Sequence, residues 1–297
     1  MTASIDDAET ALLATAGLRG NLTARPLDGG YSNHMRAVTD GERTVVLRHW
    51  KDGPDAARTE LAALREAAAD GIPVPEVLAA EADRAVLALV PGELASTVLP
   101  RATRTQAEAI GERIGAVFAT VWARPREVAG EAKRGADPLE FTPWPIRPAE
   151  LFEQLLERIT AAPPGWVAMA ADYAETMNYL LHRPVRSHSD ANPKNILLRR
   201  EGKDYTVAAL LDWEFTCAAP LEHDLGNLLR FERLGSVLGP FGTGIARGSG
   251  CDREQITLGR RLDLFAVAEL FSRENIERHG MYRVLYELAE RQLRTPL

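Results

Sequence analysis

Apolar and polar residues alternate along much of the first ninety residues, as they do in half-buried strands. Three strands are expected in the segments LTARPL, MRAVT and ERTVVLRHW, and Asp40-Gly41 predicts a two-residue hairpin before the last of them. A helix is expected in PDAARTELAALREAAADG, because Pro54 suits a first helical turn and Gly71 suits a C-terminal stop. The segment EVLAAEADRAVLALV adds two strands. This order predicts a small antiparallel sheet with one helix packed on it.

The pattern changes near residue 91, after which apolar residues recur at helical spacing. RTQAEAIGERIGAVFATVWA predicts a long helix, and further helices are expected near Pro148–Thr160, over Trp166–His182 and through most of the chain after residue 251. We therefore expect an α+β fold with two lobes. The N-lobe, residues 1–91, is small and mixed, and the C-lobe, residues 92–297, is larger and mostly helical.

Two segments of the C-lobe lack a regular pattern. Arg124–Arg147 is rich in Pro, Arg and Glu, which predicts a surface loop. Six glycines lie from Gly235 to Gly250, and because glycine is conformationally permissive we expect this segment to be mobile.

Composition narrows the class of protein. Of 297 residues, 45% are hydrophobic and 26% charged, and no apolar run is long enough to cross a membrane. The acidic start, in which Ser4 and Asp7 predict a helix N-cap, is unlike a secretory signal. Cys217 and Cys251 show no metal-ligand spacing, so we expect free thiols in a reducing cytoplasm. The net charge of −7 disfavours nucleic acid and suits a cationic small molecule, and we expect a monomer or homodimer.

The segment SHSDANPKNILL carries the most specific chemical pattern. His188, Asp190 and Asn195 have the H-x-D-x-x-x-x-N spacing of a kinase catalytic loop. Asp190 would orient a hydroxyl nucleophile and accept its proton, and the amide oxygen of Asn195 would face Mg²⁺. We expect His188 to be a buried hydrogen-bonding support of the loop and not a proton carrier.

A second metal ligand is expected at Asp212, which follows an apolar run in AALLDWEF. A turn at Glu201–Asp204 would fold this strand back on Ile196–Arg199, so that Asp212 and Asn195 meet at one end of a hairpin. An aspartate at a strand end is commonly a turn or cap residue. The combination of both motifs with a hairpin between them favours the chemical interpretation.

A nucleotide site requires phosphate contacts. Gly29, Gly30 and Ser32 lie between two predicted strands, where glycines let backbone N–H groups approach phosphates, although most Gly-Gly pairs are simple turns. No P-loop motif is present. Arg48 in TVVLRHW would reach the phosphates, and Glu60 in the next helix would hold it; the alternative for each is a solvated charge.

Adenine would dock on the backbone between the lobes, where LALVPGE offers main-chain groups of Ala88 and Val90. Leu87 and Leu89 beside them would line the pocket or fill the core.

Through these motifs the chain resembles the aminoglycoside phosphotransferase and choline kinase-like family, which are small-molecule kinases with a protein-kinase-like fold. The resemblance rests on GGYSNHMRAV, VVLRHW, TELAALREAAADGIPVPEVL, LALVPGE, SHSDANPKNILL and LLDWEFTCAAPLEHDLGNLL, in that order, over residues 28–230. It implies ATP or GTP and Mg²⁺ as cofactors, Asp190 as catalytic base, and Asn195 and Asp212 as metal ligands. It further implies that Arg48 and Glu60 form the phosphate-binding ion pair.

The resemblance also assigns Asp224, in HDLGN, the structural role of holding the catalytic loop. Two residues depart from the family pattern. Ser189 stands where glycine is usual, which would strain a loop that needs positive φ, and Arg48 stands where protein kinases carry lysine. We expect both to be tolerated.

The acceptor is less well defined by the sequence. Glu214, Glu269 and Glu274 could bind a cationic molecule such as an aminoglycoside or a basic peptide antibiotic, which implies antibiotic resistance. A helix surface of internal salt bridges is an equal alternative for Glu269 and Glu274. The rival functions are a sugar or amino-alcohol kinase, a non-catalytic ATP-binding module and a protein kinase. A protein kinase is disfavoured because this sequence has no A-P-E motif after Asp212.

Overall fold

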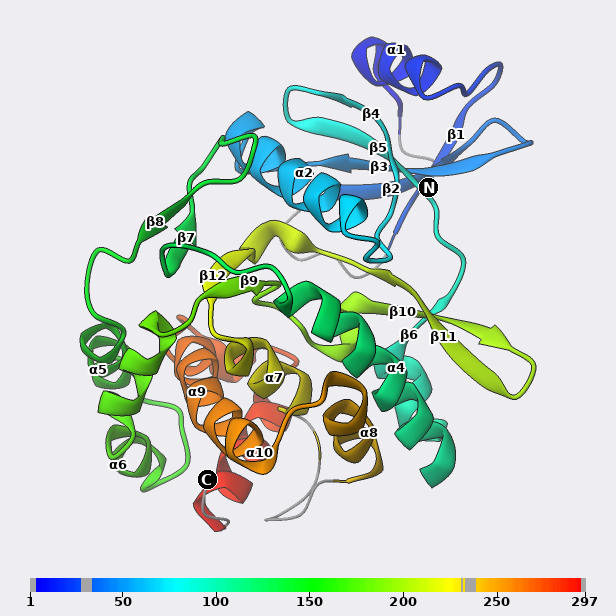
Figure 1. The fold of residues 1–297 in the computed structure, drawn as a ribbon. Helices are drawn as coiled ribbons and strands as arrows, with labels where there is room; N and C mark the ends of the chain where they lie inside the picture. Colours follow the sequence, from blue (N-terminus) through cyan, green and yellow to red (C-terminus); the bar gives the residue numbers. More distant parts are fainter. Residues whose placement is uncertain (1–3, 28–33, 231, 233–238, 295–297) are drawn as a thin grey trace.

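The N-terminal lobe is a five-stranded antiparallel sheet between two helices. The computed structural model describes residues 4–27, 34–230, 232 and 239–294 (Figure 1). The sheet has the order β1-β2-β3-β5-β4. Its strands are β1 (Thr23–Pro26), β2 (His34–Thr39), β3 (Thr44–His49), β4 (Val77–Glu81) and β5 (Arg84–Ala88). The expected three strands, helix and two strands are therefore present.

Side chains along these strands alternate between two hydrophobic clusters. Val45 and Leu47 of β3 pack with α1 (Asp7–Thr15), whereas Val46 faces the cluster that contains α2 (Pro54–Ala69). Because side chains of a strand alternate in direction, Arg48 points to the same face as Val46. The sheet register thus directs Arg48 toward α2.

Two local expectations for this lobe are wrong. The β2–β3 connection is a four-residue loop, Asp40–Arg43, because the Asp40 carboxylate accepts the N–H groups of Glu42 and Arg43 at 3.0 and 2.8 Å. Helix α1 is capped by Asp6 and not by Ser4: Asp6 accepts the Glu9 N–H at 2.7 Å and completes a capping box with that residue.

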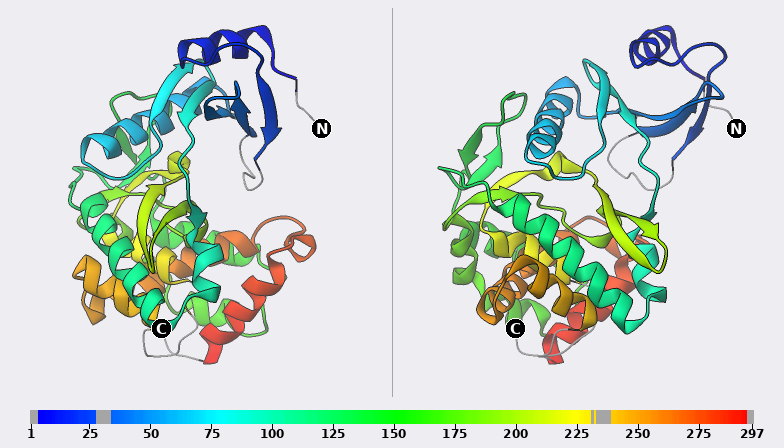
Figure 2. Two further views of the ribbon diagram at one scale, coloured as in Figure 1. Left: turned by 90° about the vertical axis from the view of Figure 1, so that its right-hand side faces the viewer. Right: turned by 45° about the vertical axis from the view of Figure 1, so that its right-hand side comes forward.

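The C-terminal lobe is mostly helical (Figure 2). Its α-helices are α3 (Ala95–Val98), α4 (Arg104–Trp122), α5 (Pro148–Glu157), α6 (Trp166–Ala171), α7 (Leu221–Leu229), α8 (Pro240–Ser249), α9 (Arg253–Phe271) and α10 (Tyr282–Arg294). Short 3-10 turns are η1 (Leu99–Arg101), η2 (Ala174–Leu181), η3 (Pro193–Asn195), η4 (Trp213–Phe215) and η5 (Ile276–Arg278). No helix of the described ranges has the length and apolar character needed to cross a bilayer.

Two small sheets lie between the helices and the N-terminal lobe. The first has the order β11-β10-β6, with β6 (Glu93–Leu94), β10 (Ile196–Glu201) and β11 (Asp204–Leu210). The second has the order β8-β7-β12-β9, with β7 (Gly130–Ala132), β8 (Phe141–Pro143), β9 (Val185–Ser187) and β12 (Cys217–Ala219). The expected surface loop at Arg124–Arg147 is therefore partly wrong, since β7 and β8 form a hairpin within it.

The glycine-rich segment is helical from residue 240 to 249, contrary to the expected mobility; residues 233–238 lie outside the described ranges. Its glycines let α8 approach α4 closely. A Cβ added at Gly244 would lie 2.0 Å from the Glu108 carbonyl oxygen, and one added at Gly111 of α4 would lie 2.1 Å from the Phe241 carbonyl oxygen. These glycines serve packing and not flexibility.

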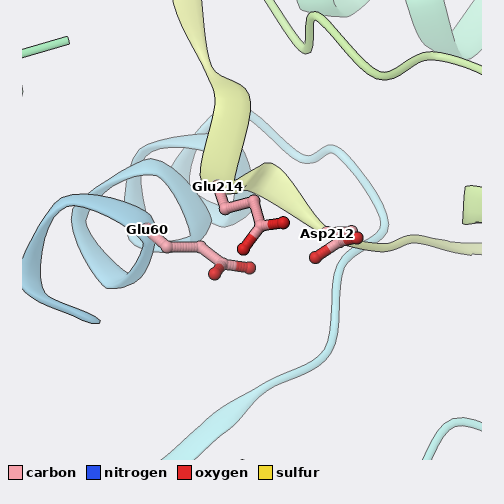
Figure 3. A group of neighbouring side chains, drawn as sticks. All are labelled: Glu60, Asp212 and Glu214. Atoms are coloured by element: carbon pink, nitrogen blue, oxygen red, sulfur yellow. The ribbon is translucent and has the colours of Figure 1, made fainter. Parts of the chain in front are cut away.

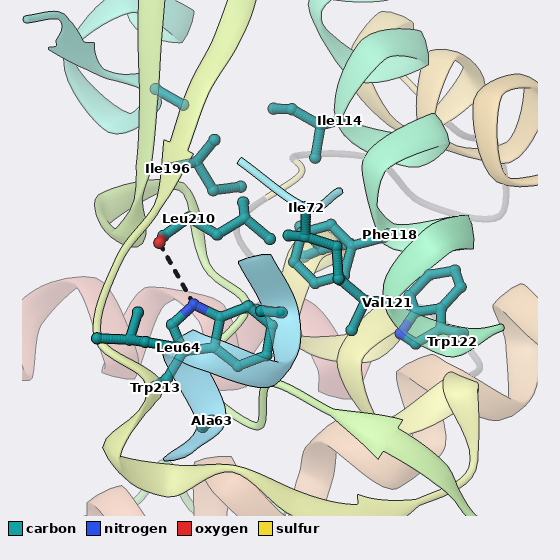
Figure 4. Close-up of a cluster of buried hydrophobic side chains, with 14 of the residues drawn as sticks. Ala63, Leu64, Ile72, Ile114, Phe118, Val121, Trp122, Ile196, Leu210 and Trp213 are labelled. Atoms are coloured by element: carbon teal, nitrogen blue, oxygen red, sulfur yellow. Dashed lines mark hydrogen bonds between the residues drawn. The ribbon is translucent and has the colours of Figure 1, made fainter. Parts of the chain in front are cut away.

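The largest hydrophobic cluster joins the two lobes (Figure 4). Leu64 and Ile72, from α2 and the segment after it, pack with Phe118 of α4 and with Leu210 and Trp213, which flank the end of β11. The Trp213 indole N–H also donates to the Leu210 carbonyl at 3.3 Å. Helix α2 is consequently packed against the segments expected to carry the chemistry.

Candidate active site

Asp190 lies in the loop between β9 and β10, where its carboxylate is held from three sides. Its Oδ1 accepts a hydrogen bond from the Asn192 amide at 2.9 Å, and its Oδ2 lies 2.8 Å from Asn195 Nδ2 and 3.0 Å from Lys194 Nζ. Burial alone would raise the pKa of Asp190, but the Lys194 ammonium and the hydrogen bond from Asn195 lower it below its ordinary value. The carboxylate is therefore ionised at neutral pH and can accept a hydrogen bond from an alcohol.

Lys194 was not singled out from the sequence. It lies four residues after Asp190 in the segment DANPK, and this spacing is the signal that the sequence offers for it.

His188 is buried beneath this loop, with 1% of its surface exposed. Its Nε2 lies 2.9 Å from the Leu211 carbonyl oxygen, and its Nδ1 accepts the Asp190 N–H at 3.3 Å. These two partners require a neutral ring with the proton on Nε2. The ring also packs on Trp213, with 4.6 Å between ring centroids. His188 thus links the backbones on either side of the site.

Asp224 of α7 is fully buried and accepts four hydrogen bonds. Its Oδ1 accepts from the Ser187 hydroxyl and the Ser189 N–H, both at 2.8 Å. Its Oδ2 accepts from the His188 N–H at 2.9 Å and the Trp122 indole N–H at 3.0 Å. A single carboxylate therefore fixes three consecutive residues just before Asp190.

Ser189 occupies the left-handed region, with φ +66°. Its N–H bonds to Asp224, and its hydroxyl lies 2.9 Å from Nε2 of His223. Burial lowers the pKa of His223 despite the opposing charges of Asp224 and Asp263, so the ring is neutral near pH 7. The Ser189 side chain therefore has a hydrogen-bond partner in α7.

Asp212 is delivered by β11 to the other side of the loop. The Leu211 N–H donates to the Asn195 carbonyl at 2.8 Å, and Ile196 pairs with Leu210, so the two predicted metal ligands lie at the same end of one hairpin. Asp212, like Ser189, has φ +66°.

Three carboxylates, those of Glu60, Asp212 and Glu214, lie close together (Figure 3). Arg48 Nη2 lies 2.7 Å from Glu60, 2.9 Å from Asp212 and 3.6 Å from Glu214. The ligand oxygens of these carboxylates lie within 4.8 Å of one another. Arg48 is therefore buried together with Glu60 and is not a solvated surface charge.

Charges in this group act strongly on one another. Burial alone would lower the pKa of Arg48, but Glu60, Asp212 and Glu214 raise it, so the guanidinium remains protonated. Burial, with the charges of Asp212 and Glu214, raises the pKa of Glu60 to about 7, against the opposing effect of Arg48 and Trp50. The indole of Trp50 donates to Glu60 at 2.7 Å.

The oxygen donors present suit Mg²⁺, which favours carboxylate and carbonyl oxygens. The amide nitrogen of Asn195 donates to the Asp190 backbone carbonyl at 3.0 Å and to its carboxylate at 2.8 Å. The amide oxygen of Asn195 is thereby directed to a different side of the loop. With Asp212 and the neighbouring Glu60 and Glu214, the site offers hard ligands from both lobes.

The remaining predicted residues are placed as follows. Gly29, Gly30 and Ser32 lie outside the described residues. The Ala88 N–H donates to the Glu76 carbonyl at 2.8 Å and is not available to a nucleotide. Leu87 is buried in the core, and Val90 is half-buried.

The three candidate acceptor glutamates do not form one group. Glu214 lies in the Arg48 cluster, and the acidic cluster found among the described residues includes neither Glu269 nor Glu274. Glu269 is 58% exposed and lies 3.9 Å from Arg273, which follows the end of α9. Glu274 lines a hollow between α5 and η5 together with Arg158 and Arg273.

The model of the phosphotransferase enzyme family matches residues 23–256. No curated protein sequence matches the chain.

Solved structures share the fold at low sequence identity. The GDP and kanamycin complex of APH(2″)-IIIa has a TM-score of 0.70 at 14% identity, over 98% of this chain and 100% of that one. The macrolide 2′-phosphotransferase MphH from Brachybacterium faecium has a TM-score of 0.63 at 17% identity, over 96% and 98% of the chains. A ternary complex of APH(4)-Ia with ADP and hygromycin B has a TM-score of 0.62 at 14% identity, over 96% and 99%.

Proposed function

Because this chain belongs to the phosphotransferase enzyme family and is a small-molecule kinase, we propose that it transfers the γ-phosphoryl group of ATP or GTP to a hydroxyl of a small, cationic molecule. The observation that carries the proposal is the ionised Asp190 carboxylate, held by Asn195 on the loop that also meets Asp212. In this proposal, residues 1–91 bind the nucleotide and residues 92–297 bind the acceptor.

Asp190 orients the acceptor hydroxyl and takes its proton as the oxygen attacks phosphorus. The bond from the γ-phosphorus to the bridging oxygen of the diphosphate breaks, and the nucleoside diphosphate leaves. Arg48, fixed by Glu60, binds phosphate oxygens of the nucleotide. Asn195 and Asp212 would hold Mg²⁺, which when bound offsets negative charge on the phosphates.

His188 and Asp224 support the loop and do not contact the reacting atoms. The buried position of His188 and the four hydrogen bonds to Asp224 support that role for them.

A cationic acceptor fits the net charge of −7 and the exposed carboxylates Glu269 and Glu274. Two of the similar structures contain kanamycin and hygromycin B, which favours an aminoglycoside or similar antibiotic and a role in resistance. A sugar or amino-alcohol kinase is the second candidate, because the ion pair between Glu269 and Arg273 leaves a smaller negative charge, which suits a neutral sugar or a singly charged amino alcohol better than a polycation.

The test is acceptor-dependent release of ADP or GDP from a panel of hydroxylated amines, macrolides, sugars and amino alcohols with Mg-ATP or Mg-GTP. We expect turnover with at least one cationic compound, and a loss of about 10²–10⁴-fold in kcat for Asp190→Ala. Asp204→Asn, an exposed carboxylate at the far end of the β10–β11 hairpin, is the control and should keep full activity.

Nucleotide binding without acceptor-dependent release across the whole panel would favour a binding module. Turnover that survives Asp190→Ala would contradict the role of that residue.

A further inference from the structure

Helix α2 carries Glu60, so the position of this helix decides whether Glu60 meets Arg48. Besides its packing on the N-terminal sheet and on Phe118 and Trp213, α2 receives a hydrogen bond at Glu60 from the Trp213 N–H at 3.2 Å. Two further sets of polar contacts with the C-terminal lobe hold the rest of the helix. These two sets of contacts are together called the α2 clamp.

The first set centres on Arg186 of β9, whose side chain is fully buried. Its Nη1 lies 2.6 Å from Asp70 and 3.3 Å from Glu66, both at the C-terminal end of α2, and its Nη2 donates to the Thr120 carbonyl of α4 at 3.4 Å. One guanidinium thus joins α2, α4 and β9.

Two further arginines complete this set. Arg124 lies 3.1 Å from Glu66 and 3.2 Å from Asp70, and Arg126 forms an ion pair with Glu66. The two carboxylates are therefore enclosed by three arginines that follow α4 or precede the catalytic loop. Because Arg186 is fully buried, its contacts are shielded from solvent more than those of the half-exposed Arg124.

The second set is the tip of the β7–β8 hairpin, which lies alongside α2 (Figures 1 and 2). The Gly135 N–H donates to the Thr59 hydroxyl at 2.8 Å, one residue before Glu60. Asp137 lies 2.5 Å from Arg65 of α2. Gly135 has φ +77°, a backbone conformation that favours glycine at this contact.

The two sets of contacts are connected through one sheet, β8-β7-β12-β9, because Arg186 lies in β9 and the hairpin tip joins β7 to β8. Strand β9 leads directly into the catalytic loop, and β12 follows the segment that contains Asp212. The strands that place the two chemical segments therefore also place α2.

We propose that Arg186 is a positioning residue that holds α2, through Glu66 and Asp70, so that Glu60 stays on Arg48 and the nucleotide site is assembled without an effector. Arg186 touches neither Glu60 nor Arg48 and acts through the helix. The proposal rests on the function proposed above.

The test compares Arg186→Met and Arg186→Lys with the wild type by calorimetric binding of Mg-ADP and by hydrogen–deuterium exchange. Arg186→Met should weaken Mg-ADP binding at least tenfold and speed exchange in residues 54–69. Arg186→Lys keeps the charge but cannot reach both carboxylates and Thr120, so it should recover part of the affinity. In kinetics with a turned-over acceptor, the nucleotide KM should rise more than kcat falls.

Phe152→Ala is the control, because Phe152 is fully buried in the cluster of α5, α6 and α9. It should lower the melting temperature as Arg186→Met does while leaving Mg-ADP affinity and exchange in α2 unchanged. If Arg186→Met does not fold, the half-buried partners Glu66→Gln and Asp70→Asn replace it, and their combination should reproduce the affinity loss.

Affinity within twofold of wild type together with unchanged exchange in α2 would overturn the proposal. If the wild type itself binds neither Mg-ADP nor Mg-GDP, the proposed function fails. Hydrogen–deuterium exchange in residues 54–69 of Arg186→Met then tests only whether Arg186 holds α2. Faster exchange than in the wild type supports this role, and unchanged exchange refutes it.

Discussion

Asp224→Asn is the most informative single substitution outside the reacting groups. Each carboxylate oxygen of Asp224 accepts two hydrogen bonds, and all four donors lie within 3.0 Å. Asparagine replaces one of these oxygens with a donor group, so two hydrogen bonds are lost whichever way the amide turns. Hydrogen bonds to a charged group contribute about 1.5–3 kcal/mol each, which gives a loss of roughly 3–6 kcal/mol.

A loss of this size should lower the melting temperature by roughly 6–24 °C, at about 2–4 °C for each kcal/mol in a chain of this size. The displaced loop should also reduce kcat by about 100-fold, since a misplacement near 1 Å is enough for that. Calorimetry and the acceptor assay measure the two effects. Asp252→Asn, at the exposed N-cap of α9, is the matched control, because asparagine caps a helix as well as aspartate does. A melting temperature of Asp224→Asn within 2 °C of wild type would refute this account of the loop.

Three further substitutions test other parts of the structure. Folding raises the pKa of Glu60 from 4.5 to about 7, so its protonation stabilises the fold below pH 4.5 and this contribution is lost as pH rises through 7. Relative to Glu60→Gln, the free energy of unfolding of the wild type should fall by about 3 kcal/mol between pH 5 and 8 in metal-free buffer. A difference in melting temperature between the two proteins that stays constant with pH would contradict this. Ser189→Gly should change the melting temperature by less than about 3 °C, because relief of the positive φ offsets the lost hydrogen bond to His223. Ser189→Val should clearly lower the melting temperature, and equal effects of the two substitutions would show that the positive φ is not the constraint. Gly244→Ala should destabilise the fold by about 1–3 kcal/mol, as at other overpacked positions, because the added methyl group would separate α8 from α4. Gly280→Ala, with open space around it, should leave stability unchanged, and similar melting curves for both variants would argue against the close approach.

The sequence was most informative where the chemistry is local. His188, Asp190 and Asn195 lie within eight residues, and the hairpin that brings Asp212 to Asn195 has a short turn, so spacing and periodicity were enough to place them. The alternation along β3 likewise directed Arg48 to the face of α2. The strand and helix order of the N-terminal lobe followed from the same periodicities.

Contacts between distant segments could not be read in this way. Arg186 lies 120 residues from Glu66 and 116 from Asp70, and nothing in the local pattern distinguishes these charges from solvated ones. The β7–β8 hairpin was missed because its strands are three residues each, too short for periodicity to appear. Glycine is used for flexible segments and for close helix contacts alike, so Gly111 and Gly244, on different helices, could be recognised as partners only in the folded structure.

Two residues with positive φ frame the site, and neither is glycine. Ser189 precedes Asp190 and Asp212 is itself a predicted metal ligand, and each such backbone costs about 1 kcal/mol or more. The surrounding contacts explain why both persist. Asp224 accepts the backbone N–H groups of both His188 and Ser189, and His188 in turn bonds to the Leu211 carbonyl just before Asp212. The same buried network therefore stabilises both unfavourable conformations, and this is why Asp224, remote from the reacting atoms, is expected to affect stability and turnover together.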